Sequence, residues 1–184
     1  MALAMKFKWL VLLIALALCA CSPALDAGPA CPAAHARYEL RGAPGAQMTL
    51  VRAPHALNAY SDLVARVEFQ DETYWFAFTS SLGFSRNYIG RTEDPFEAAR
   101  REDAGEDIGE EHREPEYDGS EYVGFDSNFD VIPEVPRAER QAPAHILANG
   151  IASAIWYSEP RRELPLGLWS LASCVGQLAP SADR

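Results

Sequence analysis

The chain has 184 residues, with 16 Lys and Arg against 26 Asp and Glu, and its formal net charge is −10 at pH 7. Both lysines, Lys6 and Lys8, lie in the first ten residues, so the rest of the chain has no lysine. A chain of this length holds one domain that can bury its own core. The charge balance leaves no basic surface to neutralise phosphates, which argues against nucleic acid and anionic lipid headgroups as partners of that domain.

The negative charge is concentrated in one segment. Residues 93–134 contain 16 Asp and Glu and three Arg, a net charge of −13, and the remainder of the domain is close to neutral. Few apolar side chains occur in the middle of this segment, which predicts an acidic loop at about 105–120. We interpret this loop either as a solvated surface or as a contact for a basic protein partner.

The first twenty residues have the pattern of a secretory signal. Lys6 and Lys8 precede ten apolar residues, Trp9 to Leu18, a run too short to span a bilayer. Leu18-Cys19-Ala20-Cys21 follows, with a Leu three residues before Cys21 and a small residue directly before it. This segment resembles the signal peptide of bacterial lipoproteins.

The resemblance implies processing before Cys21, which would then carry a diacylglyceryl thioether and an amide-linked acyl chain such as palmitate. Buried methylenes contribute roughly 0.8 kcal/mol each, so these chains suffice as an anchor. Ser22, where Asp is the usual retention signal, implies sorting to the outer membrane, with the domain facing the periplasm. The alternatives are a cleaved signal without lipid and an uncleaved anchor helix.

The whole chain is predicted to consist of a signal peptide, a tether and one domain. Residues 1–20 form the lipoprotein signal peptide, residues 21–34 a flexible tether rich in Ala, Pro and Gly, and residues 35–184 a single globular domain. If Cys19 is removed with the signal and Cys21 is lipidated, Cys31 and Cys174 remain. In an oxidising compartment they are predicted to form a disulfide; the alternative is two free thiols.

Period-two patterns predict a sheet. Apolar residues alternate with polar ones from Leu63 to Phe69 and again from Tyr74 to Thr79, with a break at Gln70-Asp71-Glu72, which is typical of a hairpin. Further short strands are predicted at residues 37–40, 47–51, 88–90, 121–125, 129–132 and 169–175. The predicted fold class is α+β, mainly an antiparallel β-sheet with one or two short helices.

The clearest helix signal is Asp94-Pro95-Phe96-Glu97, where Asp94 can cap the first turn and Gly105 can end the helix. Residues 133–143 have the composition of a Pro-rich linker. Residues 144–157 are ambiguous, because Asn149-Gly150 fits both the end of a helix and the type I′ turn of a hairpin.

No catalytic motif and no cofactor are predicted. The four histidines, His35, His55, His112 and His145, have no metal-binding spacing, and the chain has no Gly-x-Ser-x-Gly elbow. A domain without lysine cannot use Ser-Lys or Schiff-base chemistry or a P-loop. The remaining enzymatic hypothesis is a periplasmic hydrolase whose Ser, His and acid are brought together by the fold.

Asp126, Asn128 and Asp130 resemble the opening of a calcium loop, in which alternate oxygens ligate one ion. The match then fails, because Val131 replaces the required Gly and Arg137 replaces the bidentate carboxylate. The three residues are therefore a weak candidate metal site, and the alternative is a polar turn between two strands.

Six aromatic residues invite the hypothesis of a sugar-binding platform: Tyr74, Trp75, Phe76, Trp156, Tyr157 and Trp169. Most of them are expected in the core, because alternation turns half of each strand inward. Trp75 is predicted to face away from Tyr74, Phe76 and Phe78, which makes it the candidate ligand platform. The favoured function is a non-enzymatic, lipid-anchored module that binds or scaffolds a cell-wall or basic protein partner; the alternatives are the hydrolase and a weak calcium-dependent module.

Overall fold

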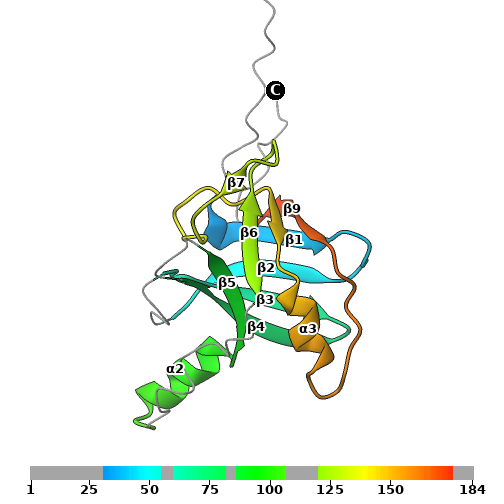
Figure 1. Cartoon of the computed structure of the whole chain (residues 1–184). Helices are drawn as coiled ribbons and strands as arrows, with labels where there is room; N and C mark the ends of the chain where they lie inside the picture. Colours follow the sequence, from blue (N-terminus) through cyan, green and yellow to red (C-terminus); the bar gives the residue numbers. More distant parts are fainter. Residues whose placement is uncertain (1–30, 55–59, 82–85, 107–119, 176–184) are drawn as a thin grey trace, which may run out of the picture. The chain divides into compact units, whose positions relative to one another are not determined.

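The folded part of the chain is an antiparallel sheet that closes on itself (Figure 1). A computed structural model describes residues 31–54, 60–81, 86–106 and 120–175. Its strands are β1 (Ala36–Leu40), β2 (Gln47–Arg52), β3 (Leu63–Phe69), β4 (Glu72–Ser80), β5 (Asn87–Thr92), β6 (Glu121–Phe125), β7 (Val131–Ile132), β8 (His145–Leu147) and β9 (Leu168–Cys174). The helices are the short 3-10 helix η2 (Ala33–His35), α2 (Pro95–Asp103) and α3 (Gly150–Trp156).

The strands follow the order β5-β4-β3-β2-β1-β9-β8-β6-β7, and every pairing is antiparallel. A further pairing of β5 with β6, in which Asn87 lies opposite Tyr122, closes eight of the described strands into a barrel. The two-residue strand β7 pairs only with β6, outside the ring. The predicted mainly antiparallel fold with one or two short helices is confirmed, and the closure of the ring was not predicted.

The β3–β4 hairpin shows how the sequence positions its side chains. Leu63, Ala65, Val67 and Phe69 are buried, as the alternation predicts. The chain reverses through Gln70 and Asp71, whose positive φ values of 50° and 66° match the right-handed twist of the flanking strands. This two-residue turn sets the register of the hairpin and therefore decides which side chains face outward together.

Large side chains fill the interior of the barrel. Tyr38, Met48, Leu50, Phe76, Phe78, Ile89, Ile146 and Trp169 are almost completely buried in one cluster. Helix α3 adds Ile151 and Ile155 to the same cluster and packs against β5. Neither α2 nor α3, the two α-helices that the structure describes, has the length and apolar composition needed to cross a bilayer.

Helix α2 begins at the residues that the sequence indicates. The Asp94 carboxylate accepts hydrogen bonds from the backbone N–H of Phe96 at 2.9 Å and of Glu97 at 3.3 Å, and Pro95 occupies the first turn. Gly105 follows the helix with a φ of +83°, a conformation that glycine adopts without strain. The predicted helix from Pro95 to about Ala104 is confirmed.

Two segments that were predicted to be irregular connections pack into the domain. Cys31 and Ala33, expected in the tether, are buried, and Ala138 and Ala142, in the predicted linker, are buried beside them. The backbone N–H of Ala142 donates to the carbonyl of Cys31 at 2.8 Å. The predicted linker at 133–143 is an irregular connection between β7 and β8, and it packs against the core because Ala and Pro also suit a segment whose backbone lies close to one.

The structure brings Cys31 and Cys174 to disulfide distance, with their Cα atoms 5.7 Å apart. Cys174 lies at the end of β9, opposite Ala36 at the start of β1. This is the pair that the cysteine count predicts. The described residues do not include the predicted signal peptide or tether residues 21–30, which contain Cys21. Residues 107–119 of the predicted acidic loop also lie outside the described residues.

The interior tyrosines predict a loss of stability at high pH. Burial raises the pKa of Tyr122 above its ordinary value of 10.0. The pKa of Tyr38 is also raised, mainly by burial and to a smaller extent by electrostatic repulsion from Tyr122. Above pH 10 both tyrosines ionise in the unfolded chain and stay protonated in the folded one, so stability falls as the pH rises. We expect the free energy of unfolding to decrease by about 1.4 kcal/mol per pH unit for each tyrosine.

Urea titrations between pH 8 and pH 11 measure this slope. Tyr122→Phe removes one of the two groups and should reduce the dependence, whereas Tyr157→Phe, at a side chain that is 75% exposed, should not. A wild-type stability that does not change above pH 10 would contradict the prediction.

Candidate binding groove

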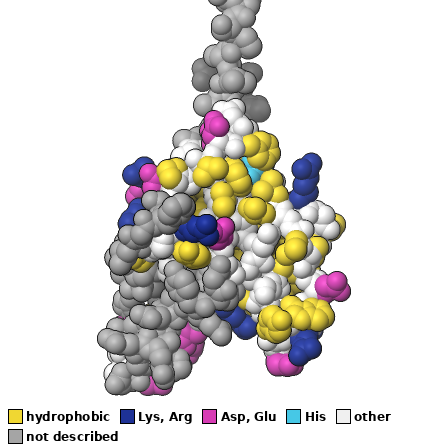
Figure 2. Space-filling model, in the orientation of Figure 1, with side chains coloured by type: hydrophobic (Ala, Val, Ile, Leu, Met, Phe, Trp, Pro, Cys, Tyr) yellow, Lys and Arg dark blue, Asp and Glu magenta, His cyan; other side chains and the backbone are white. Residues whose placement is uncertain are grey.

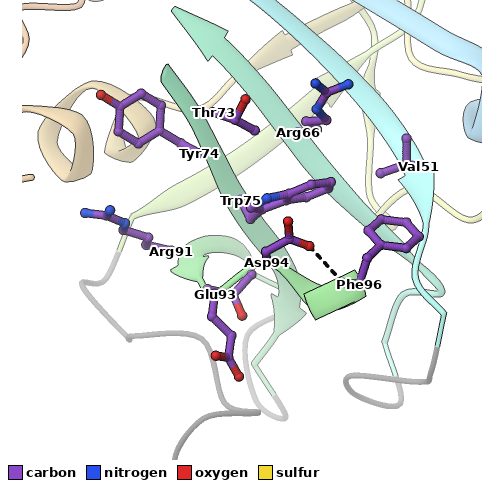
Figure 3. A pocket seen from close by; sticks show the side chains of 10 residues that line it. Val51, Arg66, Thr73, Tyr74, Trp75, Arg91, Glu93, Asp94 and Phe96 are labelled. Carbon is purple, nitrogen blue, oxygen red and sulfur yellow. Dashed lines mark hydrogen bonds between the residues drawn. The ribbon is translucent and has the colours of Figure 1, made fainter. Parts of the chain in front are cut away.

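A groove of about 720 Å³ lies at one end of β3, β4 and β5, where the chain enters α2. This volume is in the range of small-ligand sites in proteins. Figure 3 shows the side chains that line it, which are Val51, Arg66, Thr73, Tyr74, Trp75, Arg91, Thr92, Glu93, Asp94 and Phe96.

The centre of the groove is a row of side chains across three strands. In the sheet register Arg66 of β3 lies opposite Trp75 of β4, and Trp75 lies opposite Thr92 of β5. The preceding pair, Ala65 and Phe76, is buried in the core, so the alternation of the strands turns the row of Trp75 outward. Trp75 is half-buried, which leaves part of the indole accessible.

Phe96 forms a second aromatic surface beside Trp75. The ring centroids of the two residues are 5.6 Å apart and their planes are inclined by 54°. Phe96 stands in the first turn of α2, where its backbone N–H is bonded to the Asp94 carboxylate (Figure 3). The helix cap that Asp94 provides therefore also orients one wall of the groove.

The charges along the groove cancel. Its lining includes two arginines, Arg66 and Arg91, and two acidic residues, Glu93 and Asp94. Arg66 makes an ion pair of 2.8 Å with Glu68, which is half-exposed, so the pair orients the guanidinium but adds little stability. The Arg91 guanidinium lies over the Tyr74 ring, 5.7 Å from its centroid.

The structure separates the six aromatic residues of the platform hypothesis. Tyr74, Phe76 and Trp169 are buried, while Trp156 and Tyr157 are exposed at the end of α3. Trp75, the candidate singled out from the sequence, is the member of the six that stands on the outer face within the groove. Tyr74 contributes to the same lining from the buried side of β4.

Sequence reasoning missed Phe96 and Arg66 as parts of this site and treated Asp94 only as a helix cap. The register of Arg66 could have been read from the hairpin, because a two-residue turn at 70–71 places residue 66 opposite residue 75. No local signal could have placed Phe96, because its position depends on the direction in which α2 leaves β5.

The candidate metal residues form a turn between β6 and β7. One carboxylate oxygen of Asp126 accepts hydrogen bonds from the backbone N–H of Asn128 at 2.8 Å and of Asp130 at 3.0 Å. This is the geometry of the alternative interpretation, a polar turn. Within the described ranges, no group of three or more His, Cys, Asp and Glu side chains is placed to hold one metal ion.

A Ser–His contact lies elsewhere on the barrel. His145 and Ser170 face each other across β8 and β9, with 3.2 Å between His145 Nδ1 and Ser170 Oγ. Phe129 stacks on the His145 ring, with centroids 4.4 Å apart and planes within 7°. No carboxylate among the described residues bonds to this histidine, and His55 and His112 lie outside the described residues.

On the face shown in Figure 2, charged side chains of both signs are dispersed among hydrophobic and uncharged ones. The described residues on that face do not form a patch of a single charge. No protein-family model, curated protein or solved structure matches this chain. The candidate site therefore depends on its own geometry.

Proposed function

We propose that this protein is a lipid-anchored, non-enzymatic lipoprotein of the cell envelope that binds a ligand through the groove around Trp75. The observation that carries the proposal is the row of Arg66, Trp75 and Thr92, which presents an aromatic surface between polar side chains on the outside of the barrel. Sites built on paired strands are held rigidly, because each strand is fixed by its neighbours.

The proposed location is the periplasmic face of the outer membrane, with the lipid on Cys21 as the anchor. Its support is the signal sequence and Ser22, together with the Cys31–Cys174 pair at disulfide distance, which suits an oxidising compartment. The packed interior of the barrel also favours an external ligand, because large buried side chains occupy the space between the strands.

Photocrosslinking in living cells tests the groove. The full-length chain is produced with a benzophenone amino acid at Thr73, inside the groove, or at Glu39, an exposed position on β1 three strands away. We expect light-dependent adducts from position 73 and none from position 39. Equal labelling from both positions, or no adduct from position 73, would contradict a binding function of the groove.

The second candidate function is a hydrolase, favoured by the 3.2 Å contact between His145 and Ser170. Such a site needs a third group to orient the histidine and donors to stabilise an oxyanion. An adduct of a fluorophosphonate probe on Ser170 that disappears in Ser170→Ala would establish this activity in place of the binding function.

A further inference from the structure

We infer that the ligand of the groove is a glycan of neutral, N-acetylated pyranose rings, as in the glycan strands of the bacterial cell wall. This inference rests on the proposed function, since it names the ligand class of the same site. It follows from the aromatic surface, the pairing of the strands beneath it and the charge of its lining.

The aromatic pair suits a ligand with rings and apolar faces. Trp75 and Phe96 present planes inclined by 54° with centroids 5.6 Å apart, and Phe96 remains 39% exposed. A pyranose ring carries C–H groups on its faces and hydroxyls around its rim, so it can stack on an indole while its rim stays polar. A second ring of the same chain would then reach the inclined Phe96.

At Trp75 the backbone of β4 has no free edge to which an extended peptide could add. At Trp75, β4 is paired with Arg66 of β3 on one side and with Thr92 of β5 on the other. Peptides that add a strand to a sheet require unpaired backbone N–H and C=O groups. Recognition over Trp75 of β4 therefore comes from side chains, which favours a ligand that stacks on the indole and forms hydrogen bonds through its rim.

Polar groups flank the aromatic surface at the spacing of the strands. Adjacent strands lie about 4.8 Å apart, so Arg66 and Thr92 stand about 10 Å from each other across Trp75. The guanidinium can donate to a carbonyl or hydroxyl, and the threonine hydroxyl can donate or accept. Phe96 N–H and Glu97 N–H both donate to Asp94 Oδ1. No described residue donates a hydrogen bond to the other carboxylate oxygen, Oδ2.

The net charge of the lining selects against charged polymers. Arg66 and Arg91 are balanced by Glu93 and Asp94, so neither a polyanion nor a polycation would gain net attraction. The hydroxyl and acetamido groups of a neutral glycan need hydrogen-bond donors and acceptors. The arginines and carboxylates of the lining provide both, and their charges sum to zero. Because the proposed anchor holds the domain in the envelope, we commit to the cell-wall glycan as the source.

Binding of the full mature chain to two glycans tests the inference. Purified peptidoglycan sacculi are used in co-sedimentation, and a soluble tetrasaccharide of N-acetylglucosamine is titrated by calorimetry. We expect both to bind, Trp75→Ala to weaken both by about tenfold and Trp75→Phe to retain part of the affinity. Trp156→Ala is the matched control, because it removes an exposed tryptophan outside the groove.

Each outcome decides between ligand classes. Binding of sacculi without the tetrasaccharide would assign recognition to the cell-wall peptides and overturn the inference, as would binding of neither glycan. Equal affinity of Trp75→Ala and wild type would also overturn it. If position 73 still gives crosslinks while no glycan binds, the groove is a binding site for another ligand and only the ligand class is wrong.

Discussion

Replacing Cys31 and Cys174 together with serine is expected to lower the free energy of unfolding by about 3 to 5 kcal/mol. The two cysteines are 143 residues apart in sequence, so a crosslink between them would restrict nearly the whole unfolded domain. The chain-entropy model gives about 5 kcal/mol for a loop of this length, and the measured stabilisation by a disulfide is often smaller than this model predicts. The folded state would also lose the connection between the start of β1 and the end of β9.

Urea unfolding of the full chain with and without reductant measures this effect. Reductant should destabilise the wild type and leave the double serine variant unchanged, and each single variant should resemble the double one. A wild type that unfolds at the same urea concentration in both conditions would show that the two sulfurs are not bonded.

The pattern of local residues predicted the elements whose causes are local. Alternating apolar residues from Leu63 to Phe69 gave β3, and the capping geometry of Asp94 and Pro95 gave α2. Counting cysteines gave the Cys31–Cys174 pair without any geometry. In each case the deciding interaction is a few residues long or depends only on composition.

The closure of the barrel could not be predicted in this way. It depends on the pairing of β5 with β6, in which only Asn87 and Tyr88 lie opposite Tyr122 and Glu121. Insertion of β9 between β1 and β8 is equally non-local. These pairings are selected by how the whole set of buried side chains packs, so single-strand patterns do not contain them.

The candidate groove was predicted in part for the same reason. The alternation of β4 placed Trp75 on the outer face, and the structure puts it between Arg66 and Thr92. The contribution of Phe96 required the direction of α2, which depends on tertiary packing. In a site that combines a sheet face with the start of a helix, the sequence therefore predicts the side chains of the sheet face but not the position of the helix.

Residues 144–157 show a local pattern for which both predicted alternatives, the end of a helix and the turn of a hairpin, were wrong. Asn149-Gly150 suits a helix end or a tight turn, yet in the structure it begins α3, and Asn149 makes no side-chain cap. Glycine at this position is explained by a close approach. A Cβ added to Gly150 would overlap the Cβ and Oγ of Ser120 and would lie 3.3 Å from its Cα.

Gly150→Ala is therefore expected to destabilise the domain by about 2 to 3 kcal/mol. Alanine favours a helix over glycine by up to about 1 kcal/mol, and the backbone of Gly150 would accept it. Overpacking costs about 1–3 kcal/mol or more, and the opposing atom is a Cβ, which cannot rotate away as the end of a long side chain could. The overlap should outweigh the propensity and move Ser120 or the start of α3.

A double-mutant cycle separates this overlap from any general effect of the substitution. Ser120→Gly removes both overlapping atoms and should recover most of the loss caused by Gly150→Ala, whereas Ser120→Ala keeps the Cβ and should recover little. Urea unfolding of the three single variants, the two double variants and wild type gives the interaction energies directly. If Gly150→Ala is as stable as wild type, or if Ser120→Ala and Ser120→Gly rescue it equally, the contact between α3 and the start of β6 does not limit this position to glycine.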